Sequence, residues 1–188
     1  MMTKSDLRKQ IRATIRTYSE AEKLCQSEAV LGQLKQRLAS LVAQKPQCKV
    51  AWFMGSPLEL KLQELHLWLT NNHAVSLLPR VISKAEGLMS FHEVSDVSQD
   101  LIEGGYGLME PRQGLSAVSV EAVDVWICPG VAFTSLGQRL GQGGGYYDRV
   151  LARRHPDSLV FGVGFDCQLV EAFPCEPFDQ TMDEVFVG

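Results

Sequence analysis

The strongest constraint on the fold is a stretch of about thirty residues in which a strand, a turn, a helix and a second strand follow one another. Residues 49–53 form a short apolar run typical of a buried strand, and Gly55 begins a turn. Apolar residues at helical spacing predict a helix over 58–71, and residues 74–78 predict a strand that Pro79 ends. Such a βαβ unit requires parallel strands and a right-handed crossover.

The rest of the chain also alternates between helical and strand patterns. Leu7, Ile11 and Ile15 recur at a spacing of four within a helix expected over 4–18, and a capping box at 19–22 restarts a helix. The other expected elements are helices over 27–44 and 146–154 and strands over 89–91, 123–128, 159–163 and 184–187. This alternation predicts a three-layer α/β sandwich with a mostly parallel sheet, formed by residues 1–188 as a single domain.

Composition excludes several classes of protein. The chain is 45% hydrophobic and 21% charged, which is typical of a soluble globular protein. No apolar run approaches the roughly 18 residues of a membrane helix, so we expect no membrane partner. The charged start of the chain does not resemble a signal peptide, which predicts a cytoplasmic location. The five scattered cysteines include no CxxC pair and predict neither a disulfide framework nor a structural zinc site.

Charge is unevenly distributed along the chain. Residues 1–50 hold ten Lys and Arg against four Asp and Glu, whereas the remainder holds eight against eighteen. A net charge of −4 predicts no nucleic-acid binding. A basic segment on an acidic body instead indicates a local anionic ligand, or packing between the two parts. Lys4, Arg8 and Arg12 share one helix face, and their pattern alone favours a solvated basic surface.

The segment most informative about chemistry is the glycine-rich stretch 137–149, which lies between a buried strand and a helix. Its glycines let successive N–H groups converge on an anion, and a helix N-terminus adds a favourable dipole. Arg139 and Arg149 can add charge-assisted hydrogen bonds to phosphate oxygens. The position is also suitable, because ligands of open parallel sheets bind beyond the carboxyl ends of the strands.

Two interpretations of this stretch compete. It is not a Walker loop, since no Gly-Lys-Ser/Thr follows, and a flexible surface loop would also be rich in glycine. Flexibility alone does not need Tyr146, Tyr147 and Asp148 at the end of the loop, and the glycines cost entropy to order. Phosphate binding is therefore favoured. Neighbouring helix residues point about 100° apart, so we expect one tyrosine at the ligand and the other in the core.

Several motifs occur in a fixed order along the chain: Lys4-x-x-x-Arg8, Glu59, Leu78-Pro79-Arg80, Gly107-x-x-Glu110-Pro111, Pro129-Gly130-Val131-Ala132-Phe133, Arg139-Leu140-Gly141-x-Gly143-x-Gly145-Tyr146-Tyr147-Asp148-Arg149 and Gln168…Pro174-x-Glu176-x-x-Asp179. Together they resemble the 5-formyltetrahydrofolate cyclo-ligase family, also called the 5,10-methenyltetrahydrofolate synthetases. The resemblance covers nearly the whole chain. The run from the glycines to Tyr-Tyr-Asp is its most specific part.

The resemblance implies an enzyme that converts 5-formyltetrahydrofolate and ATP to 5,10-methenyltetrahydrofolate, ADP and phosphate, with Mg²⁺. An N-formyl group is an amide and therefore a poor electrophile, so its oxygen is first phosphorylated. The folate N10 then attacks the formyl carbon, the ring closes, and phosphate leaves. Such an enzyme acts mainly through positioning and electrostatics. The implied partners are 5-formyltetrahydrofolate and MgATP.

The resemblance also implies roles for individual residues. Lys4 and Arg8, one helical turn apart, would bind ATP phosphates, which replaces the interpretation of a solvated surface. Asp148 and Asp179 would hold Mg²⁺, whereas Met54 and Glu59, the latter at a helix start, would line the folate pocket. Arg139 and Tyr146 are the implied catalytic residues. The loop residues that would bind ATP are Arg139, Leu140, Gly141, Gln142, Gly143, Gly144, Gly145, Tyr146 and Tyr147.

Two other functions compete with this one. Thr134 stands where many family members have Asp, and Phe178 where His is common. These departures favour a nucleotide- or folate-binding protein of the same fold without turnover. An α/β enzyme acting on a sugar phosphate or a CoA ester would also use a glycine loop, but it would not need the Lys4–Arg8 pair. Formation of 5,10-methenyltetrahydrofolate separates all three.

Overall fold

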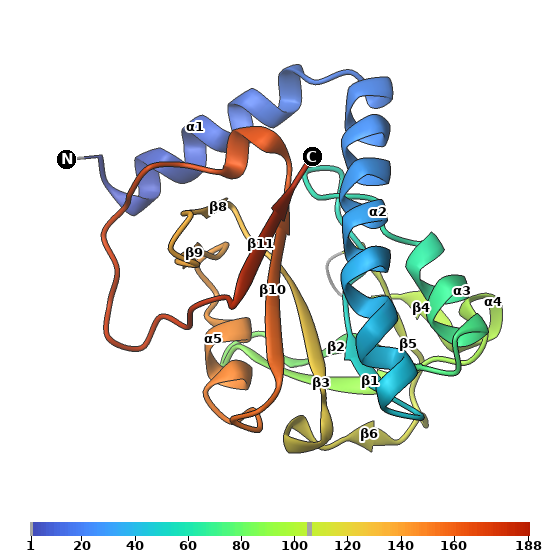
Figure 1. Ribbon diagram of the computed structural model, residues 1–188. Coiled ribbons are helices and arrows are strands. Elements are labelled where there is room, and N and C mark those ends of the chain that lie inside the picture. Colours follow the sequence, from blue (N-terminus) through green and yellow to red (C-terminus); the bar gives the residue numbers. More distant parts are fainter. Residues whose placement is uncertain (1, 105–106) are drawn as a thin grey trace.

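A computed structural model describes residues 2–104 and 107–188 of the chain (Figure 1). Its centre is a seven-stranded sheet in the order β11-β10-β7-β1-β2-β3-β6. The strands of this sheet are β1 (Lys49–Ala51), β2 (Val75–Ser83), β3 (Leu88–Glu93), β6 (Ala117–Val118), β7 (Val125–Pro129), β10 (Leu159–Gly164) and β11 (Glu184–Val187). Two small hairpins lie outside it, formed by β4 (Leu101–Glu103) with β5 (Met109–Pro111) and by β8 (Ala132–Phe133) with β9 (Arg139–Leu140).

The central sheet is mostly parallel, as the alternation of elements predicts. The pairs β1/β2, β1/β7, β7/β10 and β10/β11 are parallel, and β2/β3 and β3/β6 are antiparallel. The helices are α1 (Lys4–Thr17), α2 (Glu20–Gln44), α3 (Glu64–Asn71), α4 (Val97–Asp100) and α5 (Tyr146–Leu151), with short 3₁₀ turns η1 (Val120–Ala122) and η2 (Asp166–Gln168). No helix among the described residues is long and apolar enough to cross a membrane.

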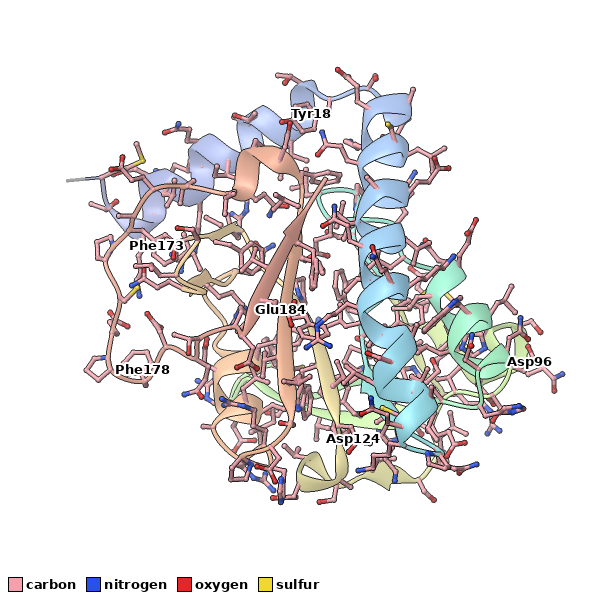
Figure 2. The ribbon with its side chains drawn as sticks, in the orientation of Figure 1. Tyr18, Asp96, Asp124, Phe173, Phe178 and Glu184 are labelled. Carbon is pink, nitrogen blue, oxygen red and sulfur yellow. The ribbon has the colours of Figure 1, made fainter. Side chains whose placement is uncertain are left out.

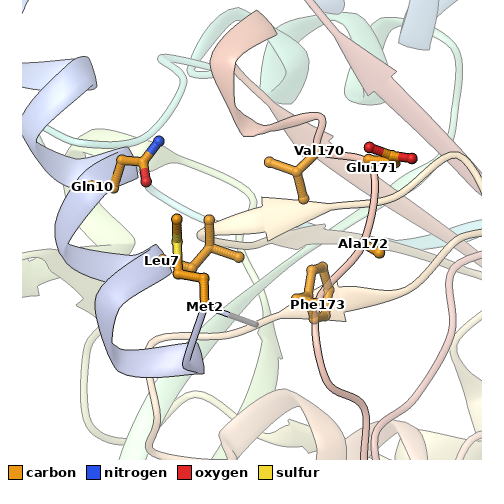
Figure 3. A pocket seen from close by; sticks show the side chains of 7 residues that line it. All are labelled: Met2, Leu7, Gln10, Val170, Glu171, Ala172 and Phe173. Atoms are coloured by element: carbon orange, nitrogen blue, oxygen red, sulfur yellow. The ribbon is translucent and has the colours of Figure 1, made fainter.

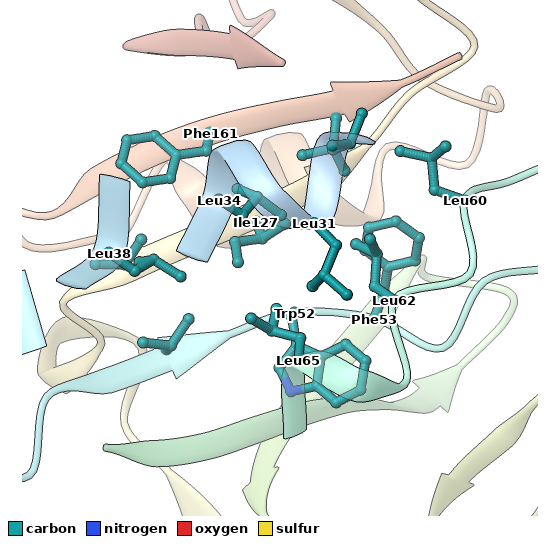
Figure 4. Close-up of a cluster of buried hydrophobic side chains, with 14 of the residues drawn as sticks. Leu31, Leu34, Leu38, Trp52, Phe53, Leu60, Leu62, Leu65, Ile127 and Phe161 are labelled. Atoms are coloured by element: carbon teal, nitrogen blue, oxygen red, sulfur yellow. The ribbon is translucent and has the colours of Figure 1, made fainter. Parts of the chain in front are cut away.

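Side chains that alternate along the central strands separate the core into two layers. Val50, Ile127 and Phe161 belong to the core on the face that is covered by α1, α2 and α3. Figure 4 shows Ile127 and Phe161 beside the leucines of α2. Their strand neighbours Trp126 and Val160 point to the opposite face and pack against α5. Helices therefore cover both faces, and the predicted three-layer sandwich is confirmed.

The first two helices begin where the sequence predicts. The Thr3 hydroxyl caps α1 by accepting the N–H of Asp6, and the expected stripe of Leu7, Ile11 and Ile15 is buried. A capping box between Ser19 and Glu22 starts α2. The sequence suggested a separate helix over 27–44, but α2 continues without interruption from the capping box to Gln44.

The helix expected over 58–71 is shorter than predicted and begins at Glu64. Leu60 and Leu62 are both fully buried, which requires alternation rather than a helical period in this part of the chain. The turn before them is tight, because a Cβ on Gly55 would lie 2.3 Å from the Leu60 carbonyl oxygen. Glu59 therefore lies in this turn, not at a helix start.

Pro79 does not end its strand, contrary to the prediction. β1 pairs with β2 only as far as Leu77, so beyond that residue this edge of β2 is no longer paired with β1. Proline, which lacks an N–H, is tolerated at such an edge. Antiparallel pairing with β3, Pro79 opposite Phe91, carries β2 on to Ser83. The helix expected over 146–154 also ends early, at Leu151.

Candidate active site

The predicted site residues gather at one edge of the sheet. β1 and β7 are parallel neighbours, so their carboxyl ends lie at the same edge. The chain that leaves β1 carries Met54 and Glu59, and the chain that leaves β7 forms the β8–β9 hairpin and then the glycine loop, residues 141–145. Leu7 and Ile11 of α1 pack in one cluster with Leu140. This places α1 over the hairpin, in the position where open α/β sheets bind ligands.

The basic face of α1 contacts the glycine loop. The Arg8 Nε atom donates a hydrogen bond to the Gly141 carbonyl oxygen at 2.8 Å. Arg12 donates to the side-chain oxygen of Gln142. These arginines are therefore not spread over a solvated surface, and the pattern-based interpretation is wrong for this face. They bring positive charge to the loop that was predicted to hold phosphates.

The loop backbone depends on its glycines. Gly143 has φ 106° and Gly145 has φ 67°, a region that side chains with a Cβ rarely adopt. Gly145 is also the N-cap of α5. This helix has only six residues, so its dipole is short, and any phosphate bound here would depend mainly on loop N–H groups and nearby cations.

Arg139 and Asp148 form a buried ion pair beside the loop. The Arg139 Nη2 atom lies 2.9 Å from Asp148 Oδ1, and the arginine side chain is 3% exposed. The guanidinium also donates to the Pro129 carbonyl oxygen at 3.2 Å and lies over the Tyr147 ring at 5.4 Å. Its Nε atom is buried without a hydrogen-bond partner among the described residues. Arg139 thus joins the end of β7 to the start of α5.

Lys4 and Asp179 form the second ion pair of the site. Their Nζ and Oδ2 atoms are 2.8 Å apart, with the side chains 21% and 17% exposed. Glu176 Oε2 is also within 3.7 Å of Lys4. Burial favours the protonated form of Asp179, but hydrogen bonds from Lys4 and the Glu176 N–H outweigh burial and lower the pKa of Asp179. The carboxylate is therefore ionised at neutral pH.

The two predicted metal ligands lie close together. The N–H of Gln180, the residue after Asp179, donates to Asp148 Oδ1 at 3.3 Å. Asp148 accepts its bonds at Oδ1 and Asp179 at Oδ2, so in the described part of the chain one oxygen of each carboxylate is left for a cation. Across residues 2–104 and 107–188, no group of three or more His, Cys, Asp or Glu gathers as metal ligands. Two carboxylates suit Mg²⁺, which commonly takes its remaining ligands from water and phosphate.

The two tyrosines separate as predicted. Tyr147 packs against the cluster formed by Trp126, Val150 and their neighbours, and its hydroxyl oxygen is buried without a partner among the described residues. Burial raises the pKa of Tyr147 well above its ordinary value. Tyr146 instead lies against the loop, because a Cβ on Gly144 would be 2.8 Å from its ring.

The predicted folate residues lie across from the loop. Glu59 Oε2 accepts the N–H of Ser56 at 2.9 Å, which fixes the carboxylate in the turn after β1. The charge of Glu59 contributes, after burial, to the raised pKa of Tyr147. Met54 is half-buried at the margin of the core. The structure thus brings together the residues predicted for folate and for ATP.

Thr134 and Phe178, which depart from the family pattern, do not disturb the predicted site. The Thr134 hydroxyl accepts the Gln138 N–H at 3.2 Å and closes the β8–β9 turn, a structural task. Phe178 is 65% exposed on the long segment between η2 and β11, where Figure 2 shows it with Phe173. Neither residue displaces a predicted ligand from the site.

Some contacts of the site were missed from the sequence. Arg149, suggested as a phosphate ligand, donates to the backbone oxygens of Gly144 and Gly87 in this structure, and its contact with phosphate stays a prediction. Gly87 ends the turn between β2 and β3, and Gln180 joins Asp148 to the C-terminal segment. No local motif points to Gly87 or Gln180, because their roles arise from contacts between distant parts of the chain.

A separate pocket of about 490 Å³ lies between the start of α1 and the C-terminal segment (Figure 3). Its lining residues are Met2, Leu7, Gln10, Val170, Glu171, Ala172 and Phe173. None of the predicted ATP, folate or metal residues is among them. We therefore place the candidate active site at the glycine loop and not in this pocket.

Comparisons with known proteins place the chain among enzymes of one kind. The sequence profile of the 5-formyltetrahydrofolate cyclo-ligase family matches residues 1–188. A 5-formyltetrahydrofolate cyclo-ligase of Haemophilus influenzae is 27% identical over 96% of this chain and 97% of its own length. The Escherichia coli protein of the same name is 34% identical over 72% of this chain and 75% of its own length.

Solved structures agree with the fold. The NMR structure of Aquifex aeolicus 5,10-methenyltetrahydrofolate synthetase matches with a TM-score of 0.83 and 33% identity, over 99% of this chain and 90% of that one. A 5,10-methenyltetrahydrofolate synthetase from Mycoplasma pneumoniae matches with a TM-score of 0.79 over 98% of both chains. At 23% identity, the second match shows a shared fold.

Proposed function

This chain belongs to the 5-formyltetrahydrofolate cyclo-ligase family, whose members close 5-formyltetrahydrofolate to 5,10-methenyltetrahydrofolate with ATP as co-substrate, and we propose that it does so at the glycine loop. One observation carries this assignment. Lys4, Arg8, Arg139, two carboxylates and Glu59 converge from four distant segments on the edge of the sheet where that loop lies. A loop without a ligand would not need this concentration of charge.

We assign ATP binding to the loop and to the cations around it. Residues 141–145 supply backbone N–H groups, and their positive φ angles at Gly143 and Gly145 let the chain curve around an anion. Lys4 and Arg8 supply charge from α1. Arg139 supplies charge from below the loop, where its burial strengthens any bond to a phosphate oxygen.

In the free protein, the proposed phosphate and metal ligands neutralise one another. Lys4 is paired with Asp179, and Arg139 with Asp148. When MgATP enters, both cations can turn to phosphate oxygens while both carboxylates ligate Mg²⁺, so that each charged side chain of the two pairs exchanges one partner of opposite charge for another. Mg²⁺ held there offsets the charge that develops as the γ-phosphoryl group transfers. ATP and Mg²⁺ should therefore bind far better together than separately.

Glu59 and Met54 are assigned to the folate. The Ser56 N–H holds one oxygen of Glu59, and the carboxylate is an acceptor for the N–H groups of the folate ring. Glu59 follows β1 and the glycine loop follows β7, its parallel neighbour, so folate bound at Glu59 would lie beside ATP. Proximity of the two substrates supplies the main catalytic effect in this scheme.

The proposed chemistry proceeds in two steps. The formyl oxygen attacks the γ-phosphorus of ATP, and ADP leaves. The folate N10 then attacks the activated formyl carbon, N10 loses its proton, and phosphate leaves as the ring closes. Arg139 stabilises charge on the transferring group, and Tyr146, beside the loop, orients it.

The two assignments can be tested by their opposite effects on the two ligands. Gly143→Ala has room for its Cβ, whose nearest neighbour is Arg8 at 4.0 Å, but strains a backbone with φ 106°. Such strain costs about 1–2 kcal/mol, so ATP affinity measured by titration calorimetry should fall about tenfold with folate affinity unchanged. Glu59→Gln should weaken 5-formyltetrahydrofolate and leave ATP unaffected.

Gly114→Ala is the matched control for this experiment. Gly114 has φ 95° and similar free space, with its nearest contact 3.9 Å away, but it lies between β5 and β6. Its substitution should change neither affinity. Normal ATP binding by Gly143→Ala would refute the assignment of the loop, and normal folate binding by Glu59→Gln would refute that of the pocket.

A further inference from the structure

We propose that Arg149 is a positioning residue that fastens the glycine loop to the β2–β3 hairpin and so turns a loop N–H group toward the phosphates of ATP. The proposal rests on the proposed function of the loop. It differs from the role suggested by the sequence, in which Arg149 contacts phosphate itself.

Within the described residues, Arg149 donates its hydrogen bonds to backbone oxygens. Its Nη1 atom donates to the Gly144 carbonyl oxygen at 2.7 Å and, more weakly, to the Gly87 carbonyl oxygen at 3.4 Å. An NH₂ group has two hydrogens, so these two acceptors account for both of them. The guanidinium also lies against Gly145, where a Cβ would be 2.8 Å from Nη1.

The position of Gly87 leaves room for Arg149 but not for a Cβ. It lies in the turn just before β3, is buried, and has φ 64°. A Cβ at this position would lie 2.3 Å from Arg149 Nη1 and 2.6 Å from the Gly144 carbonyl oxygen. Only glycine therefore allows the hairpin and the glycine loop to approach this closely.

The orientation of one peptide group links this clamp to ligand binding. The peptide between Gly144 and Gly145 is planar and trans, so its C=O and N–H point in opposite directions. Arg149 holds the carbonyl of Gly144 toward the hairpin, and the N–H of Gly145 consequently faces the opposite side. Arg8 holds the start of the loop through the Gly141 carbonyl oxygen. The loop is thus fixed at both ends to rigid elements before any ligand binds, which lowers the entropy cost of binding.

Four variants test the proposal. Arg149→Met removes the clamp, Arg149→Lys keeps the charge but loses the planar guanidinium, and Gly87→Ala removes the clamp from the hairpin side. Arg153→Met is the control, because Arg153 follows α5, is 69% exposed and has only Glu121 as its ion-pair partner, at 3.6 Å, among the described residues. For each variant, the Kd for ATP and for 5-formyltetrahydrofolate, the KM for ATP, kcat and Tm are measured.

A positioning role predicts that all three clamp variants raise the Kd and KM for ATP about tenfold. The Kd for folate and kcat at saturating ATP should change less than about twofold. The substitutions make the loop less ordered before ATP binds, and bound ATP orders it again. The double variant Gly87→Ala/Arg149→Met should be no weaker than either single variant, because both break the same contact. Arg153→Met should match wild type.

Three results would overturn the proposal. Wild-type ATP affinity in Arg149→Lys, with a loss in Arg149→Met, would make Arg149 a phosphate ligand. Unchanged ATP affinity in Gly87→Ala would remove the hairpin from the site. Equal losses for ATP and folate with a lower Tm would indicate a folding defect. If instead wild-type protein does not bind ATP at all, the proposed function itself fails.

Discussion

At the scale of single residues, the two ion pairs of the site differ in how deeply their cations, Arg139 and Lys4, are buried. Arg139 is almost fully buried, and Asp148 is its ionic partner. Removing one member of a buried pair typically costs about 3–5 kcal/mol, so substitution of Asp148 confounds metal binding with stability. Lys4 is 21% exposed against 3% for Arg139, so loss of its carboxylate partner leaves a charge that water can reach, and Asp179 is the better residue on which to test the exchange of partners.

Asp179→Asn should bind ATP more tightly than wild type in the presence of EDTA, because Lys4 loses its nearer ionic partner, at 2.8 Å, and is more available to phosphate. With Mg²⁺ the same variant should turn over more slowly, because one metal ligand is lost. Titration calorimetry with and without Mg²⁺ measures the first effect independently of activity. Glu176→Gln is the control, since Glu176 is 3.7 Å from Lys4 and 51% exposed. Weaker ATP binding by Asp179→Asn in EDTA would contradict the exchange.

The sequence predicted which residues gather at the site better than it predicted their contacts. Lys4, Arg139 and Asp179 lie together as the resemblance implies, because the motif retains each of them. The backbone contacts of Arg149 were not predicted, because a sequence shows a charge but not the acceptors that it meets. Of its two acceptors, Gly144 and Gly87, the second lies in a distant hairpin and approaches only when the sheet forms.

At the scale of elements, α1 is fixed along its whole length. Its apolar stripe is buried, and its basic face reaches the glycine loop and Asp179. Just beyond its last residue, the Tyr18 hydroxyl donates to Asp166 Oδ1 of η2 at 2.6 Å. This bond joins the end of α1 to η2, the turn that follows β10.

Tyr18→Phe should lower the free energy of unfolding by about 0.5–1 kcal/mol at neutral pH, the lower part of the range for one hydrogen bond. Burial and the bond to Asp166 raise the pKa of Tyr18 above its ordinary value of 10.0. The unfolded chain therefore ionises first, and the contribution of Tyr18 is complete below about pH 10 and declines as the pH rises further. Urea denaturation of both proteins across this range measures the difference. A difference that stays constant above about pH 10 would contradict the assignment.

Sequence patterns predicted poorly the elements whose ends depend on contacts with segments outside them. Leu58, Leu62, Leu65 and Leu69 are spaced as in a helix, but the tight approach of Gly55 to Leu60 delays α3 until Glu64. Pro79 is an ordinary strand terminator, yet it is accommodated where β1 no longer pairs with β2. By contrast, the boundaries of α1 were predicted closely because capping and periodicity are local.

At the scale of the whole molecule, basic residues of the N-terminal part form ion pairs with acidic residues of the remainder. Lys4 pairs with Asp179, Arg37 with Glu184 and Lys45 with Asp124, each joining the basic N-terminal part to the acidic body. Packing between the two parts is therefore one confirmed source of the asymmetry. The other explanation of the uneven charge is an anionic ligand. It applies to the basic residues of α1 that face the glycine loop.

The parallel sheet explains why so many distant residues meet. Strands β1 and β7 end at the same edge, and the C-terminal segment after β10 passes alongside it to bring Asp179 and Gln180 to the loop. Motifs that are far apart in the sequence thus form a single site only because of the sheet topology. Sequence alone predicted the edge but not the contact of the β2–β3 hairpin with the loop.

The most direct test of the whole account is the absorbance of 5,10-methenyltetrahydrofolate in a mixture of this protein, 5-formyltetrahydrofolate, ATP and Mg²⁺. We expect absorbance to increase only when all four are present, with ADP and phosphate formed in equal amounts to product. Gly143→Ala should require more ATP for the same rate, and Glu59→Gln more folate. If both ligands bind but no product forms, the protein is a binding protein of this fold and the account of its catalysis is wrong.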